Sequence, residues 1–364
     1  AIGLLAAFAA AQPANVYTGA SPSLIDFSTI WDARWYEHVA TRGYPDVLPR
    51  DASGAIEDNA WAFMPVYPML VRALVRLGLD WEVAALGLAW AASAVFAVLA
   101  YRLLRETIPQ HAGFALALVL LGPVAPLLQV GYAESLHLAL LAGALLALRH
   151  RRWWMLAALV PLMALTRPSG LAFALALAIV AAWAWRRERE AWSRRDLGIL
   201  VALAAWALAW GLAWPAYAAL RTGEPGAYVE TELGWRAPYV GTMELVPGTG
   251  WVAGAQWWLG GAGLGLLVLV VGGLVWMLAR RTTRAAMGLE PWAWTIAYLL
   301  YLLAVWFPQS STFRILLPAF GLLAVVAVLP GRWWRPVALA IAVAGQVAWV
   351  WACWWLIGVD WTIP

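Results

Sequence analysis

Residues 28–44 form the segment of the sequence in which acidic, basic and aromatic side chains stand closest together. Aromatic and aliphatic residues recur there at helical spacing from Trp31 to Ala40, which predicts an amphipathic helix lying on the membrane surface. Gly43 is a typical residue to end it. Asp32 falls in the first turn of this helix. Its carboxylate can act as a general base or merely stabilise the helix N-terminus, and the spacing leaves both interpretations open.

A second polar and aromatic patch covers residues 58–68, where Pro65 and Pro68 surround Tyr67. Two prolines three residues apart predict a fixed turn that leads into a second amphipathic helix at 69–78. Nothing in this patch indicates catalysis, and shaping of a substrate site is the role we expect. The candidate substrate-binding residues of the whole chain are Trp31, Trp35, Tyr36, His38, Asp58, Tyr67, Tyr132 and Glu134.

Three further ionisable side chains stand at the ends of apolar segments. Glu134 begins one, and His137 follows on the same helical face. A Glu-x-x-His pair can bind a metal in a helix bundle, but the sequence shows no partner carboxylates in other helices, so Glu134 is better interpreted as the polar wall of a cavity. Arg167 and Arg314 are permanent cations on the same expected side as Asp32, and are candidates for binding a phosphate.

The elements that must position these residues belong to a membrane protein. Of the 364 residues, 64% are hydrophobic and only 12% are charged, whereas soluble domains carry roughly 25% charged residues. This composition excludes a soluble enzyme, a disordered chain and a disulfide scaffold. Ten apolar segments follow a polar region at 13–80. They are 83–101, 112–130, 133–148, 153–166, 170–185, 197–219, 255–279, 292–307, 315–330 and 337–357.

The apolar stretch 1–11 is too short to cross a bilayer, since about 20 residues are needed. We therefore expect it to be the end of a first, truncated span. The predicted fold is an all-α integral membrane bundle of about eleven transmembrane helices, forming one domain over 1–364.

Arginine placement predicts the orientation of this bundle. Five turns hold 15 of the 24 basic residues, all arginine, and the opposite side holds 15 of the 20 acids. By the positive-inside rule the arginine-rich turns are cytoplasmic, which makes 13–80, 220–254 and 307–314 extracytoplasmic. We thus expect a multi-pass protein of the cell membrane with its active site on the outer face. The five turns are 102–105, 149–152, 186–195, 280–284 and 332–335.

Two adjacent segments, 153–166 and 170–185, are short for a membrane span. Their junction contains Arg167 and Pro168, and an arginine at membrane depth must face a cavity rather than lipid. This hairpin is predicted to end at the floor of a cavity. Two short helices in a locally thinned bilayer are the alternative.

Several classes of cofactor and partner have no support in the sequence. The single cysteine, Cys353, excludes an internal disulfide and cysteine-based metal centres. Glycine-rich phosphate loops and dinucleotide motifs are absent. The pI of about 9.4 reflects arginines that set topology, so nucleic acid is not an expected partner. No cofactor is predicted, and a divalent metal is not excluded.

Five stretches of the sequence resemble the PIG-V-like family (GPI mannosyltransferase II and its bacterial relatives), which belongs to the C-type glycosyltransferase superfold. They follow the family's order from residue 31 to about 318. The stretches are Trp31-Asp32-Ala33-Arg34-Trp35-Tyr36 with Gly43-Tyr44, Ala62-Phe63-Met64-Pro65-Val66-Tyr67-Pro68, Tyr132-Ala133-Glu134-Ser135-Leu136, Thr166-Arg167-Pro168-Ser169-Gly170, and Phe313-Arg314 with Pro318.

This resemblance implies an inverting mannosyl transfer from a polyprenyl-phosphate sugar to a lipid-linked, glycan or protein acceptor at the membrane. The acidic residue of the first outer loop is the presumed base in such enzymes, and it corresponds to Asp32. Polyprenyl phosphate is a good leaving group, so one carboxylate can deprotonate the acceptor while arginines hold the departing phosphate.

Two other classes of protein fit parts of the same pattern. A lipid or sugar transporter, or a flippase, also has broken spans and buried charge, but the sequence shows no internal repeat. A non-catalytic membrane subunit would use the tryptophan-rich surface to dock a partner. The large polar region at 13–80 favours an enzyme.

Overall fold

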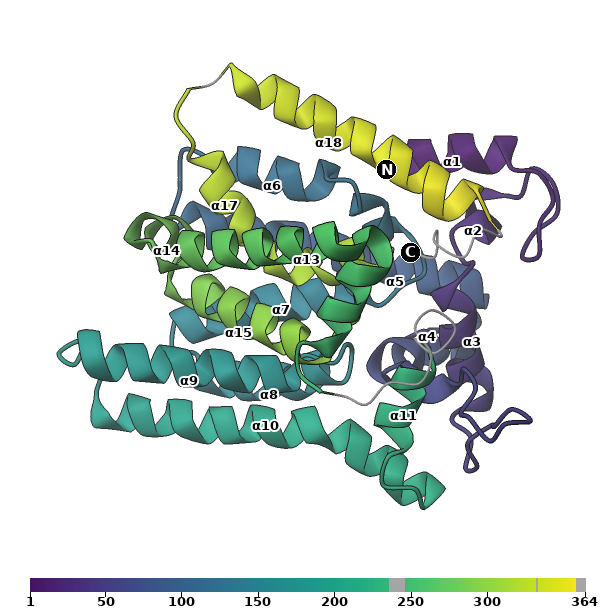
Figure 1. The fold of residues 1–364 in the computed structure, drawn as a ribbon, viewed down its shortest axis with the longest axis horizontal. Coiled ribbons are helices and arrows are strands. Elements are labelled where there is room, and N and C mark those ends of the chain that lie inside the picture. The colour runs from purple at the N-terminus through teal and green to yellow at the C-terminus, as the bar shows by residue number, and fades with distance from the viewer. Residues whose placement is uncertain (236–245, 332, 358–364) are drawn as a thin grey trace. The chain divides into compact units, whose positions relative to one another are not determined.

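The protein is built from helices. The computed structural model describes residues 1–235, 246–331 and 333–357, and no β-strand occurs in those ranges (Figure 1). This confirms the predicted all-α class. Part of the predicted outer loop 220–254, residues 236–245, lies outside the described ranges.

The chain folds into two compact units. The first comprises Ala1–Thr41, Pro65–His150 and Ser310–Pro364, and the second comprises Arg42–Met64 and Arg151–Gln309. The prediction of one domain over 1–364 is not tested by this division and stays a prediction.

The first unit is formed by helices from the N-terminal and the C-terminal parts of the chain. Its α-helices are α1 (Ile2–Ala11), α2 (Leu24–Phe27), α3 (Asp32–Arg42), α4 (Val66–Arg76), α5 (Trp81–Arg105), α6 (Ala112–Leu121), α7 (Glu134–Arg149), α16 (Thr312–Ile315), α17 (Leu322–Ala327) and α18 (Trp334–Val350). Its shorter elements are the 3-10 helices η2 (Ala125–Gln129) and η3 (Leu317–Ala319) and the π-helix η4 (Trp351–Trp355).

The second unit contains seven α-helices and one 3-10 helix among the described residues. They are η1 (Ala60–Ala62), α8 (Trp153–Ala164), α9 (Gly170–Arg187), α10 (Arg194–Thr222), α11 (Ala227–Gly234), α13 (Thr249–Ala279), α14 (Arg281–Met287) and α15 (Leu289–Val305).

Five helices of the described chain are long and apolar enough to cross a membrane. They are α5, α9, α10, α13 and the helix Trp334–Trp355, which joins α18 to η4. A sixth candidate is the pair α14 and α15, which is bent by 109° at its break. These helices make the chain a membrane protein, while the predicted eleven spans stay a prediction.

Three of the predicted apolar segments are not continuous helices. The segment 255–279 lies in α13, whose backbone leaves the helical conformation at Gly260, with φ of 55° and ψ of −137°. The segment 112–130 contains α6, which stops before Gly122 and Pro123, and then the buried 3-10 helix η2. The segment 315–330 is divided among α16, η3 and α17. Proline removes a backbone donor and ends a helix, and irregular backbone at membrane depth is tolerated where protein surrounds it. Hydropathy detects the apolar run but not this break.

Two other predicted spans form helices that are short for a bilayer. Helix α7 has 16 residues and α8 has 12. The predicted segment 170–185 forms α9, which has 18 residues and is counted among the five candidate spans. The expectation that both helices beside Arg167 are too short therefore applies to α8 and not to α9.

Packing in the first unit centres on α5, which contacts α7, α6 and α4. Helix α3 is attached to α4 by an edge-to-face contact between Tyr36 and Tyr67, whose ring centroids are 5.0 Å apart. The hydroxyl of Tyr67 in turn donates to the carbonyl of Ala85 in α5 across 3.0 Å. Both tyrosines are buried. These contacts fix the helix that carries Asp32 to the core of its unit.

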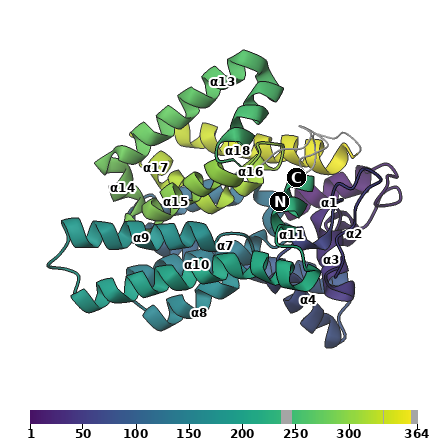
Figure 2. The ribbon, with the colours of Figure 1, turned by 60° about the horizontal axis from the view of Figure 1, so that its bottom comes forward.

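In the second unit, α9 and α10 run side by side in both views (Figure 1 and Figure 2). Two glycines allow the close approach, because a Cβ added at Gly170 would lie 2.6 Å from the Cα of Gly211. Only hydrogen fits in that space, and the two backbones gain extensive van der Waals contact.

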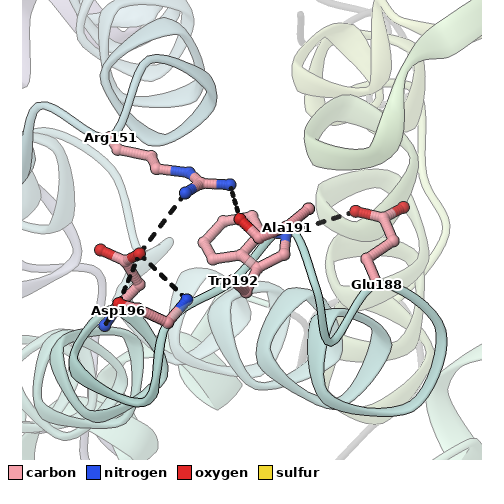
Figure 3. A network of polar contacts seen from close by, with 6 residues as sticks. Arg151, Glu188, Ala191, Trp192 and Asp196 are labelled. Atoms are coloured by element: carbon pink, nitrogen blue, oxygen red, sulfur yellow. Dashed lines mark hydrogen bonds and ion pairs between the residues drawn. The ribbon is translucent and has the colours of Figure 1, made fainter.

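A polar network at the start of α8 links three segments of the second unit (Figure 3). Arg151 donates to the carbonyl of Ala191 across 2.7 Å and to Asp196 across 3.4 Å, and its guanidinium lies 4.1 Å from the ring of Trp192. Ser193 and Asp196 form a capping box at the start of α10. Part of the predicted cytoplasmic arginine group thus holds helix ends together.

Candidate functional site around Asp32

Asp32 lies in the first turn of helix α3, as predicted, and the helix ends at Arg42 before Gly43, whose φ is +80°. A glycine adopts this left-handed conformation without steric cost, which makes it a suitable helix stop. The buried face of α3 consists of Ala33, Tyr36, Val39 and Ala40. The buried face therefore differs from the one predicted from the spacing between Trp31 and Ala40. Trp31 precedes the helix, and Trp35 is only partly buried.

The carboxylate of Asp32 is paired with a cation that lies far away in the sequence. Nη1 of Arg314 donates to Oδ2 of Asp32 across 2.6 Å, and Nε of Arg314 lies 3.5 Å from Oε1 of Glu134. The three side chains are 15%, 11% and 5% exposed for Asp32, Arg314 and Glu134 respectively. Arg314 therefore bridges two largely buried carboxylates, all within the first unit.

The local backbone explains how these residues meet. Glu134 stands in the first turn of α7, where a negative charge is favourable. The loop before it is attached to the segment between α2 and α3, because the backbone N–H of Gly131 donates to the carbonyl of Ser28 across 3.0 Å. Arg314 lies in the short helix α16, and η3 immediately after it contacts α7.

Tyr132 completes this group of residues. Its hydroxyl oxygen accepts the backbone N–H of Asp32 at 3.2 Å, and its ring centroid is 5.7 Å from Cζ of Arg314. Burial, together with the charge of Asp32, raises the pKa of Tyr132 well above its usual value. The phenol consequently stays neutral at physiological pH and can orient the first turn of α3.

The group carries two carboxylates and one guanidinium, so its formal charge is −1 when all three are ionised. Such a site holds the Asp32 carboxylate in a fixed place beside the guanidinium of Arg314. It can take a proton from a hydroxyl, and its arginine can form paired hydrogen bonds to an incoming phosphate.

The remaining predicted residues of the first unit occupy different positions. Tyr36 and Tyr67 are enclosed by protein and act in packing. The rings of Trp35 and His38 lie 5.9 Å apart on the less buried side of α3. A substrate-binding role for these four residues stays a prediction.

Asp58 and Arg167 belong to the second unit. Asp58 is exposed, and Asn59 beside it caps η1 and bonds Thr231 across 3.0 Å. Arg167 follows α8, and the Ser169 hydroxyl donates to its carbonyl across 3.0 Å. Pairing of Arg167 with Arg314 as a phosphate clamp stays a prediction.

An acidic residue near Arg167 was missed from the sequence. Burial, the charge of Glu232 and a hydrogen bond to it raise the pKa of Tyr228, and the charge of Arg167 opposes this shift. Arg167 and Glu232 thus both act on the Tyr228 hydroxyl. Glu232 stands in α11, more than 60 residues from Arg167 in the sequence, so no local spacing relates the two residues.

Metal ligands do not gather in the part of the chain that the structure describes, where no group of three or more His, Cys, Asp or Glu side chains can hold an ion. Glu134 and His137 are both buried on α7. Comparison with known proteins adds no assignment, since no protein-family model and no curated protein matches the sequence.

Proposed function

We propose that the protein is an inverting glycosyltransferase that moves a sugar, mannose above all, from a polyprenyl-phosphate donor to a lipid-linked, glycan or protein acceptor. The observation that carries this proposal is the Asp32–Arg314–Glu134 group. Three of the stretches that resemble the PIG-V-like family contribute one residue each to this group, although they are separated by 102 and 180 residues along the chain.

In the proposed mechanism, Asp32 accepts the proton of the acceptor hydroxyl. The acceptor oxygen attacks the anomeric carbon, and the bond from that carbon to the phosphate oxygen breaks. The electron pair leaves with the polyprenyl phosphate. A β-linked donor then yields an α-linked product. A base placed in this way accelerates the reaction by roughly 10²–10⁴-fold.

Arg314 stabilises the negative charge of the departing phosphate in this mechanism. A guanidinium presents several N–H donors in one plane and can bond a carboxylate and a phosphate at the same time. Because Arg314 bonds Oδ2 of Asp32, the other carboxylate oxygen, Oδ1, is the proton acceptor in this mechanism. Glu134 lies 3.5 Å from Nε of the same guanidinium, and this ion pair favours its direction.

The site is proposed to lie on the extracytoplasmic face of the cell membrane, in a multi-pass protein of the C-type glycosyltransferase fold. The distribution of arginines and acids supports this orientation. A polyprenyl-phosphate donor is itself embedded in the bilayer, and apolar helices of the same unit, α5 and the helix Trp334–Trp355, offer it a hydrophobic surface.

Purified protein incubated with a panel of radiolabelled polyprenyl-phosphate sugars and membrane lipid extract tests the proposal. We expect label to pass from one donor to an acceptor. A protein that transfers no sugar but moves labelled donor across a vesicle membrane is a transporter or flippase. Protein without either activity fits a non-catalytic subunit, and both outcomes contradict the proposal.

A further inference from the structure

Trp31 adopts a backbone conformation that a bulky side chain rarely takes. Its φ is +57°, and the only other non-glycine residues of positive φ in the described chain are Ser21 and Arg151. For a large residue this left-handed conformation is a genuine outlier. Such strain persists only where surrounding contacts hold it, and it concentrates at functional sites.

Two indole groups hold this strained residue in place. Nε1 of Trp31 donates to the carbonyl of Cys353 across 3.0 Å, and Nε1 of Trp354 donates back to the carbonyl of Phe27 across 2.7 Å. The segment that precedes α3 is therefore tied to the π-helix η4 in both directions. The ring of Tyr17 packs against Trp31 at 4.9 Å between centroids.

The position of Trp31 decides where Asp32 lies. Its carbonyl accepts the N–H of Arg34 at 3.0 Å, and Asp32 is the first residue of the helix that follows. The left-handed turn thus sets the direction in which α3 starts. From this start the backbone N–H of Asp32 donates to Tyr132 and its carboxylate accepts from Arg314.

We infer that Trp31 is a positioning residue for the catalytic carboxylate, and that its indole N–H serves the protein rather than a bound sugar. This inference rests on the proposed function, in which Asp32 is the base. It assigns the π-helix Trp351–Trp355 a part in the site, although η4 is separated from Asp32 by more than 300 residues.

The substitution Trp31→Phe tests the inference, because it keeps an aromatic ring against Tyr17 while it removes the indole N–H donor and one ring of the indole. Trp206→Phe is the matched control, since Nε1 of Trp206 also donates to a backbone carbonyl, that of Ala157, across 3.0 Å in the second unit. We expect kcat of Trp31→Phe to fall about 10- to 100-fold with the donor KM within about twofold, because a small misplacement of a reacting group is costly.

Hydrogen exchange of a peptide covering 28–42 provides a readout that needs no activity. Faster exchange in Trp31→Phe than in Trp206→Phe is expected, because the start of α3 loses its anchor. If kcat and exchange match those of the control, the inference is wrong. If the wild-type protein transfers no sugar, the proposed function fails, and the exchange of this peptide still decides whether Trp31 positions Asp32.

A second variant keeps the inference testable if the Trp31→Phe protein does not fold. Trp31→Gly can adopt φ of +57° without strain, so its backbone conformation is favoured while the indole anchor is lost. We expect kcat of this variant to fall as well. Wild-type turnover by Trp31→Gly contradicts the inference, because the backbone turn alone would then suffice to position Asp32.

Discussion

Arg314 donates to Asp32 across 2.6 Å while its Nε lies 3.5 Å from Glu134. One guanidinium thus serves the proposed base and a second carboxylate, in surroundings that leave each side chain at most 15% exposed. Removing the cation leaves two like charges buried together, which is unfavourable. The shared guanidinium therefore stabilises the site. It also means that substitutions of Asp32, Glu134 and Arg314 are expected to have different effects.

Arg314→Ala is expected to destabilise the protein by about 3–5 kcal/mol, the cost of breaking a buried ion pair. Thermal unfolding in detergent measures the effect. The control is Arg34→Ala, because the Arg34–Glu37 pair is 42% and 33% exposed and exposed pairs contribute about 0–1 kcal/mol. Equal melting temperatures for the two variants would show that the buried group does not support the fold.

Glu134→Gln is expected to lower the donor KM while the fold is kept. The substitution removes one negative charge from a group with formal charge −1, and repulsion of a phosphate about 8 Å away costs roughly 2 kcal/mol at an effective dielectric constant of ~20. Donor binding should tighten by roughly 30-fold, because every ~1.4 kcal/mol changes an affinity about tenfold. A weaker donor affinity would contradict this prediction and would mean that Glu134 supports donor binding, either directly or by fixing the direction of Arg314.

Gly211→Ala is expected to destabilise the second unit by about 1–3 kcal/mol, because a methyl group there meets the backbone of Leu171 at 2.7 Å. Gly198→Ala is the matched control in the same helix, where an added Cβ meets nothing within 4 Å. That control should be neutral or stabilising by up to about 1 kcal/mol. Thermal unfolding that does not separate the two variants would contradict the close packing of α9 on α10.

Cysteine labelling in intact cells tests the orientation. An impermeant thiol reagent should label Ser53→Cys and spare Glu190→Cys, because the loop 13–80 is predicted outside and the turn 186–195 inside. Both positions are exposed, and the native Cys353 is buried. The opposite labelling pattern would place Asp32 in the cytoplasm.

Local features of the site could be predicted from the sequence. The spacing from Trp31 to Ala40 and the stop at Gly43 predicted α3, and the first-turn position of Asp32 is confirmed. The prolines around Tyr67 predicted a turn that leads into a helix at 69–78, whereas the structure begins this helix at Val66 and ends it at Arg76. Pro68 therefore lies in the first turn of the helix and not in a turn before it. These features depend on helix periodicity and on residues that end helices, which act over a few positions.

The contacts between distant segments could not be predicted. The Asp32–Arg314 pair joins residues 282 positions apart, and no periodicity encodes such a meeting. The strained turn at Trp31 depends on a carbonyl in η4, so no local signal favoured it. The break after α6 occurs at Gly122 and Pro123, which are residues that end helices. The continuous hydropathy of 112–130 nevertheless predicted one uninterrupted segment.

The most direct test of the account is the turnover of Asp32→Asn with a polyprenyl-phosphate sugar, measured beside Asp26→Asn. Asp26 is an exposed first-turn carboxylate of α2, so its substitution removes a comparable helix-end charge, which is worth only about 0.3–1 kcal/mol. The account predicts that Asp32→Asn loses roughly 10²–10⁴-fold in kcat while the fold is retained and the donor binds at least as tightly as in the wild type, because one negative charge is removed. Asp26→Asn should turn over like the wild type. Retention of more than about a tenth of wild-type turnover by Asp32→Asn would contradict the assignment of Asp32 as the general base.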